Sequence, residues 1–136
     1  YWVYREKSPF LRYYATRLNF PVDFELMNQA ARLLLETRDF TSFSKLHTDV
    51  KTNICKVTQA QWTSVDGNLW QFEITADRFL RNMVRSVVGT LVDVGRGRIS
   101  LEEFARVIQA KDRCAAGESM PGNALSLWDI TYDFEI

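Results

Sequence analysis

The stretch LWQFEITADRFLRNMVRSVVG, residues 69–89, changes its hydrophobic period at Asp77, and this change decides the predicted fold class. Before Asp77, apolar and polar residues alternate as in a half-buried antiparallel strand. After it, apolar residues recur every three or four positions, which is typical of an amphipathic helix. The helical face comprises Phe79, Leu80, Met83, Val84, Val87 and Leu91. The stretch therefore predicts a strand over 69–76 and, after an Asp77 cap, a helix from Arg78 to about Val94.

The residues upstream of this stretch predict three further elements. Asp66-Gly67 indicates a hairpin turn with a positive φ at the glycine, which joins a strand over about 54–64 to the next strand. Asp23 is placed to cap a helix over about 24–36. The chain opens on an aromatic and β-branched run, residues 1–4, which is also typical of a strand.

The residues downstream complete the pattern. Gly95 and Gly97 are expected to end the long helix, because glycine adopts the backbone conformation found after helix ends. Ser100 and Glu103 form a capping box for another helix, and an alternating strand follows residue 123. The order of elements predicts an α+β domain with an antiparallel sheet and helices packed on one face.

The composition suits a single folded domain and excludes several classes of protein. The 136 residues carry 17 basic and 17 acidic side chains, so the whole surface does not bind nucleic acid, although a local basic patch remains open. Cys55 and Cys114 give neither a disulfide framework nor a zinc site. No apolar run approaches the roughly 20 residues of a membrane span. The chain begins at Tyr1 inside a strand-like run, which we interpret as the start of a domain cut from a longer protein.

The polar face of the long helix carries the first functional signal. Arg78, Asn82, Arg85 and Gly89 share this face on a helical wheel. A glycine inside a helix costs about 1 kcal/mol relative to alanine, and it is retained where another backbone comes close. Arg85, one turn before Gly89, is thus expected to be partly covered and to need an anionic partner. Spacing alone favours a carboxylate on a neighbouring element of the same domain.

Four segments in order resemble the TruA family of tRNA pseudouridine synthases. The run ADRFLRNMVRSVVGTL over 76–91 is similar to the family pattern Phe-Leu, two variable positions, Met-Val-Arg and Gly-x-Leu. RDFTSF over 38–43 resembles the family's His-Asp-Phe-x-x-Phe. KDR over 111–113 and ALSL over 124–127 resemble its Asp-Arg and Gly-Leu-x-Leu segments.

The resemblance implies an activity. Family members convert uridines of the tRNA anticodon arm to pseudouridine without a cofactor or a metal ion. They are cytoplasmic homodimers with an attacking aspartate in a Gly-Arg-Thr-Asp motif. That motif does not occur here, so we interpret the chain as the C-terminal half of such an enzyme, expected to be inactive alone.

The resemblance also assigns site residues. Arg85 is implied to pair with the aspartate from the other half of the enzyme. The tyrosine that stacks on the flipped base is either Tyr1 or a residue upstream of it. Leu125 and Leu127 are implied to line the uracil pocket, although ordinary core positions are an equal alternative for Leu125.

Four polar residues are candidates for RNA contacts. Lys45, Arg78 and Arg81 are placed to contact phosphates, and Asn82 accompanies them. Each of the cations could instead be an ordinary solvated charge. The competing hypothesis for the whole chain is a non-catalytic α+β domain that binds RNA or another protein.

Overall fold

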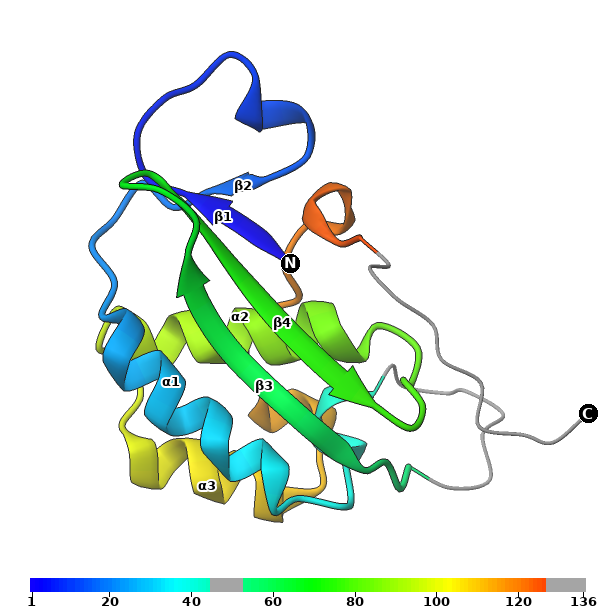
Figure 1. The fold of residues 1–136 in the computed structure, drawn as a ribbon. Coiled ribbons are helices and arrows are strands. Elements are labelled where there is room, and N and C mark those ends of the chain that lie inside the picture. The colour runs from blue at the N-terminus through cyan, green and yellow to red at the C-terminus, as the bar shows by residue number, and fades with distance from the viewer. Residues whose placement is uncertain (45–52, 127–136) are drawn as a thin grey trace, which may run out of the picture.

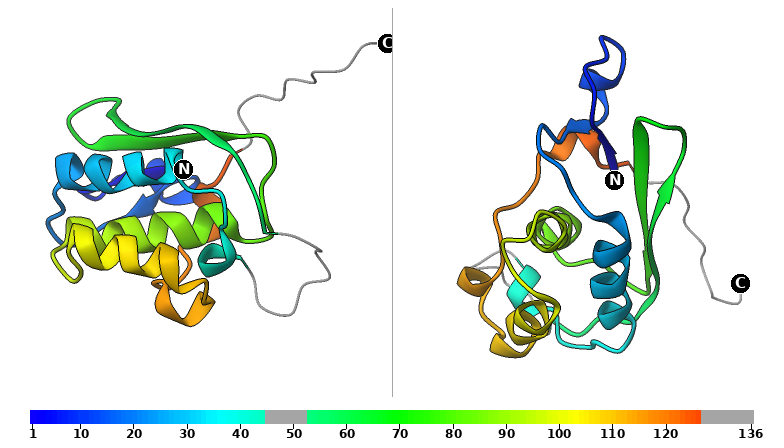
Figure 2. Two further views of the ribbon diagram at one scale, coloured as in Figure 1. Left: turned by 90° about the horizontal axis from the view of Figure 1, so that it is seen from below. Right: turned by 90° about the vertical axis from the view of Figure 1, so that its left-hand side faces the viewer.

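The computed structural model describes residues 1–44 and 53–126, which form a mixed four-stranded sheet and three α-helices (Figure 1). The strands are β1 (Trp2–Tyr4), β2 (Thr16–Arg17), β3 (Val57–Ser64) and β4 (Leu69–Ala76). The helices are α1 (Phe24–Arg32), α2 (Met83–Gly95) and α3 (Leu101–Ala110). All three helices lie on the same face of the β3–β4 hairpin (Figure 2). The predicted α+β class with helices on one face is confirmed.

The sheet has the order β2-β1-β4-β3 and differs from the prediction at one edge. β1 pairs antiparallel with β4, placing Val3 opposite Trp70, and β4 pairs antiparallel with β3. β2 pairs parallel with β1, placing Val3 opposite Thr16, so the sheet is mixed. Because β2 has only two residues, it produces no alternating pattern, so the sequence carries no strand signal there.

The β3–β4 hairpin forms as predicted, but its turn closes by a different mechanism. The carboxylate of Asp66 accepts hydrogen bonds from the backbone N–H groups of Asn68 and Leu69, each at 2.8 Å. These bonds hold the pKa of Asp66 below its ordinary value. Among the described glycines only Gly97 has a positive φ, so the positive φ predicted for Gly67 is wrong. The aspartate side chain, and not the freedom of the glycine, closes this turn.

Local capping signals place the outer helices correctly. The Asp23 side chain accepts a hydrogen bond of 3.0 Å from the N–H of Leu26 and caps α1. A 3₁₀ turn over Leu33–Leu35 continues α1 toward the predicted end. Ser100 and Glu103 form the predicted capping box at the start of α3, with bonds of 3.1 and 3.2 Å.

The predicted start of α2 is wrong, because the helix begins at Met83 and not at Arg78. The Asp77 carboxylate accepts the N–H of Lys56 at 2.8 Å, which ties it to the entry of β3 and leaves it no capping role. Asn82 precedes the helix in the left-handed conformation, with φ 66°, which asparagine tolerates better than most residues. Residues 78–82 are therefore not helical, and they do not share the helical face of Arg85.

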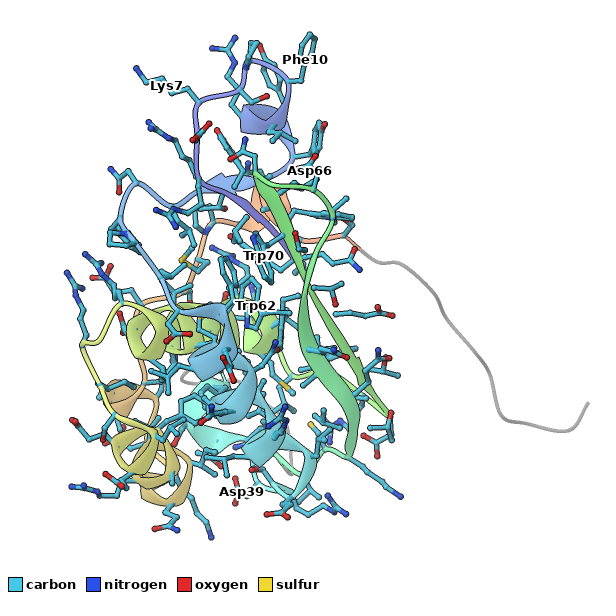
Figure 3. The ribbon with its side chains drawn as sticks, turned by 60° about the vertical axis from the view of Figure 1, so that its left-hand side comes forward. Lys7, Phe10, Asp39, Trp62, Asp66 and Trp70 are labelled. Atoms are coloured by element: carbon cyan, nitrogen blue, oxygen red, sulfur yellow. The ribbon has the colours of Figure 1, made fainter. Side chains whose placement is uncertain are left out.

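The core lies between the hairpin and the helices. α2 is its central element, since only Arg85 and Asp93 of its 13 residues are not buried. Trp62 is 2% exposed, and the Phe24 ring stacks on Trp70 with a centroid distance of 3.8 Å (Figure 3). Trp62 therefore belongs to the core, and Trp70 is partly buried against it. No helix formed by the described residues is long and apolar enough to cross a membrane.

Candidate functional site around Arg85

A segment after α3, residues 117–122, runs alongside α2, and we call it the flanking segment. It approaches the helix so closely that a Cβ atom on Gly89 would overlap the carbonyl oxygen of Glu118. The N–H of Gly117 donates a hydrogen bond of 3.0 Å to the hydroxyl of Thr90. The expectation that Gly89 admits a second backbone is thus confirmed. This approach places the flanking segment against Arg85, one turn earlier on the helix.

The flanking segment holds Arg85 through both backbone and side-chain contacts. The Nε of Arg85 donates a hydrogen bond of 2.7 Å to the carbonyl oxygen of Met120. The N–H of Met120 donates in return to the carbonyl oxygen of Arg85 at 3.0 Å. Gly122 lies beside the guanidinium, where a Cβ atom would be 3.6 Å from its Cζ. Arg85 is therefore half-buried and its side chain is oriented by the segment.

The partner of Arg85 is a backbone carbonyl and not a carboxylate. Two ion pairs occur within residues 1–44 and 53–126, Arg98 with Asp93 and Lys111 with Asp39, and neither includes Arg85. The alternative of a structural salt bridge to a neighbouring element therefore finds no support in the described part of the chain. A carbonyl bound at Nε leaves the Nη edge of the guanidinium as the side that can receive an anion.

Tyr1 lies at the same site, although it is at the other end of the sequence from the flanking segment. Its hydroxyl donates a hydrogen bond of 2.6 Å to the carbonyl oxygen of Pro121 and lies 2.7 Å from the Thr16 hydroxyl. Burial raises the pKa of Tyr1, and the positive charge of Arg85 acts in the opposite direction. The side chain is 6% exposed. The structure thus brings Tyr1 and Arg85 together through consecutive residues, Met120 and Pro121.

A second group of contacts fixes the start of the flanking segment. Arg113 donates hydrogen bonds of 2.9 Å to the carbonyl oxygen of Gly117 and to the hydroxyl of Ser119. Asn82 donates to the same hydroxyl from the residue before α2. Sequence reasoning placed Asn82 at the site but missed Ser119 and gave Arg113 no role. The glycines at the two ends of the flanking segment, Gly117 and Gly122, were the available signal, because glycine permits close backbone packing.

The remaining predicted site residues are distributed differently. Arg78 is half-buried and donates to the carbonyl oxygen of Ile54 at 3.5 Å, and Arg81 is exposed. Leu125 is 41% exposed, so the core formed by the described residues does not bury it. Lys45 and Leu127 lie outside the described residues.

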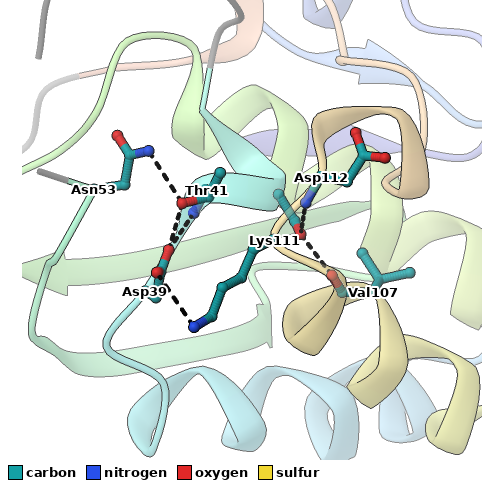
Figure 4. Close-up of polar contacts among 7 residues, drawn as sticks. Asp39, Thr41, Asn53, Val107, Lys111 and Asp112 are labelled. Carbon is teal, nitrogen blue, oxygen red and sulfur yellow. Dashed lines mark hydrogen bonds and ion pairs between the residues drawn. The ribbon is translucent and has the colours of Figure 1, made fainter.

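The family-like segments 38–43 and 111–113 meet beside α3 (Figure 4). The carboxylate of Asp39 accepts hydrogen bonds from the N–H and the hydroxyl of Thr41 and pairs with Lys111 at 3.8 Å. Burial opposes the ionisation of Asp39, but the Thr41 bonds and the Lys111 charge outweigh it, so its pKa lies below the ordinary value. The Ser42 hydroxyl accepts the N–H of Asp112 at 3.0 Å. The loop at 39–43 thereby anchors the segment that leads to Arg113.

No group of three or more His, Cys, Asp and Glu side chains within residues 1–44 and 53–126 is arranged to hold a metal ion. The arrangement instead offers an oriented cation beside an aromatic residue, which suits the binding of an anionic group. By its fold and its site, this protein is an α+β domain that presents an arginine with no carboxylate partner among the described residues.

Comparison with known proteins places this domain in a family. Residues 30–133 match the sequence model of the family described as tRNA pseudouridine synthase, so the chain belongs to the tRNA pseudouridine synthase family.

Relatives support the same assignment over the full chain. The tRNA pseudouridine synthase A of Bacteroides fragilis is 55% identical over 136 residues, covering 100% of this chain and 54% of the relative. The protein of the same name from Bacteroides thetaiotaomicron is 56% identical over 138 residues, covering 100% and 51%. That of Bacillus subtilis is 42% identical over 135 residues, covering 98% and 54%. The chain spans about half the length of the curated relatives it matches.

Proposed function

We propose that this chain is the C-terminal half of an enzyme that converts uridines of the tRNA anticodon arm to pseudouridine. Its family membership and its similarity to proteins named tRNA pseudouridine synthase A support this reaction. One structural observation supports its role in the reaction. The guanidinium of Arg85 is oriented by Met120 while no carboxylate among the described residues pairs with it.

In this proposal Arg85 completes a site whose nucleophile lies outside residues 1–136. An aspartate from the rest of the enzyme bonds to the target nucleotide, the N–C bond between uracil and ribose breaks, and the uracil turns and bonds to the ribose through carbon. The aspartate is then released, the proton on that ring carbon is lost, and the freed ring nitrogen gains a proton. The positive charge of Arg85 lowers the pKa of that aspartate and keeps it ionised. The Met120 bond restricts the rotamers of Arg85, so the aspartate meets a pre-oriented partner.

Other residues of the domain shape the nucleotide site. Tyr1 holds the flanking segment through Pro121, and the aromatic ring that stacks on the flipped base comes from Tyr1 or from a tyrosine upstream of it. Leu125, which is exposed, and Leu127 contribute to the uracil pocket. Arg78, Arg81, Asn82 and Lys45 contact the RNA. The whole enzyme works in the cytoplasm as a homodimer without a cofactor, which sedimentation and metal analysis of the full-length protein can test.

Replacement of Arg85 in the full-length enzyme tests the proposal. Arg85→Ala should remove most pseudouridine formation from an unmodified tRNA transcript while the thermal unfolding midpoint changes little. Arg106→Ala is the matched control, because Arg106 is exposed on α3 and makes none of the site contacts described above. Turnover near the wild-type rate in Arg85→Ala would exclude Arg85 from the mechanism. Residues 1–136 alone should produce no pseudouridine.

A further inference from the structure

The loop between β1 and β2, residues 5–15, projects beyond the sheet at the end where the β3–β4 turn lies (Figure 1). The side chain of Asn68 holds its base by accepting the N–H groups of Arg5 and Glu6, at 2.9 and 2.6 Å. Within the loop, the N–H of Ala15 donates to the carbonyl oxygen of Leu11 at 2.9 Å. The projection therefore has a defined backbone and can present side chains in fixed directions.

The tip of the β1–β2 loop presents aromatic rings to solvent (Figure 3). Phe10 is 76% exposed, Tyr13 68% and Tyr14 50%. They make up three of the eight large hydrophobic side chains that are exposed within residues 1–44 and 53–126, and they fall within five positions. Scattered exposed apolar residues are normal, whereas a cluster of this kind marks a binding surface.

The charges around these rings select the kind of partner. Residues 5–17 carry Arg5, Lys7, Arg12 and Arg17 against a single acidic residue, Glu6, in a chain whose net charge is zero. Aromatic rings and arginines also occur at protein interfaces, but four cations against one acidic residue require a partner whose surface is strongly negative. Cations interleaved with aromatic rings suit a nucleic acid strand, because phosphates pair with the cations and bases stack on the rings.

The Arg12 side chain links the two kinds of contact. Its guanidinium lies over the Tyr13 ring, 4.7 Å from the centroid, and donates to the Tyr13 hydroxyl at 2.6 Å. This contact holds a cation beside an exposed ring. A base stacked on a neighbouring ring would then have its phosphate within reach of a positive charge.

We propose that the β1–β2 loop is a second contact site for the tRNA substrate, away from the reacting uridine. Phe10, Tyr13 and Tyr14 stack on unpaired bases, and Lys7 and Arg12 bind the adjoining phosphates. The inference rests on the proposed function, since it takes tRNA as the substrate.

Two variants of the full-length enzyme test the site, with an unmodified tRNA transcript as the probe. Phe10→Ala/Tyr13→Ala should weaken equilibrium tRNA binding about 30-fold or more and raise the KM for tRNA, because each removed ring deprives a base of its stacking partner. Lys7→Ala/Arg12→Ala should lower the slope of log affinity against log salt by roughly 0.7–0.9 for each phosphate that the loop no longer binds. The matched control is Leu35→Ala/Arg106→Ala, which removes an exposed apolar residue and a cation elsewhere, and it should bind like wild type.

The other outcomes are equally informative. Wild-type tRNA affinity and salt slope in both loop variants would overturn the proposal, and an altered oligomeric state in sedimentation would then assign the loop to a protein contact. Weakened tRNA binding in the loop variants of an enzyme that forms no pseudouridine would uphold the contact site and overturn the proposed reaction. Full activity of the wild type with unaffected loop variants would overturn the contact site alone.

Discussion

Gly89 of α2 and Glu118 of the flanking segment meet without room for a side chain between them. A Cβ atom on Gly89 would overlap the carbonyl oxygen of Glu118 and lie 3.0 Å from its carbonyl carbon. The obstacle is backbone, so it cannot move aside as a flexible side chain would. Because the same segment binds Arg85 two residues later, the spacing at Gly89 controls the geometry of the site.

Gly89→Ala should therefore displace the flanking segment and disturb Arg85. Alanine is the better helix former by about 1 kcal/mol, so an isolated helix would be stabilised. Overpacking here costs about 1–3 kcal/mol, which outweighs that gain. The full-length variant should melt at a lower temperature and form pseudouridine more slowly. Gly67→Ala is the control, because a Cβ there meets nothing within 4 Å and the φ is not positive, and it should change neither quantity.

Arg85→Lys should fail to restore activity although it keeps the charge. A lysine cannot bind the Met120 carbonyl and present two parallel N–H groups to a carboxylate, whereas a guanidinium can. Loss of this orientation is expected to reduce kcat about 100-fold, as small misplacements at catalytic groups do. Single-turnover pseudouridine formation with saturating tRNA measures the loss. A rate within a factor of about three of wild type would show that charge alone suffices.

Arg113→Met should impair the reaction indirectly, by loosening the residues that lead to Met120. The substitution removes the bonds to Gly117 and Ser119 but retains much of the apolar stem. The kcat should fall while the KM for tRNA changes little, because the segment orients Arg85 and does not itself bind phosphate. Arg113→Lys should recover part of the rate by restoring one of the two bonds. Equal kcat values for both variants and the wild type would contradict this positioning role.

Elements with local signals could be predicted from the sequence. The Ser100–Glu103 capping box involves residues three apart, and its hydrogen bonds form as their spacing requires. The close approach at Gly89 was also visible, because glycine inside a helix is costly without such a neighbour. The start of α2 was predicted wrongly, since Asp77 binds Lys56, a residue 21 positions away whose location depends on the folded sheet.

The site was predictable only in part, for the same physical reason. The motif around Arg85 indicated that the residue matters, but no local pattern indicates that its Nε binds Met120, 35 positions later. The contact between Tyr1 and Pro121 spans 120 positions, and it arises because β1 and the flanking segment meet beside α2. Such contacts follow from tertiary packing, which periodicity and capping signals do not encode.

Ser100→Ala should lower stability without changing the chemistry. The hydroxyl of Ser100 accepts the N–H of Glu103 at 3.1 Å, and removing an N-cap of this kind costs about 1 kcal/mol. Urea unfolding of the full-length enzyme should show a lower midpoint with an unchanged slope. Gln109→Ala in the exposed part of α3 provides the comparison and should change the midpoint little. A reduced pseudouridine rate at a temperature where both variants are folded would show that α3 affects the site.

Asp39→Asn should remove part of the dependence of stability on acid pH. Burial alone would raise the folded-state pKa of Asp39, but bonds from Thr41 and the charge of Lys111 outweigh it and hold the pKa below its ordinary value. The folded protein therefore favours the ionised form. This stabilisation is complete above the unfolded-state pKa of about 3.9 and is lost as the pH falls through the lower folded-state value. Asparagine keeps the oxygen that accepts from Thr41 but cannot ionise, so the fall in unfolding midpoint below about pH 4 should be shallower in the variant.

Glu102→Gln on the exposed start of α3, where the carboxylate makes none of these bonds, serves as the control and should keep the wild-type slope. An identical acid dependence in Asp39→Asn and wild type would show that the Asp39 charge does not stabilise the contact between the 39–43 loop and Lys111.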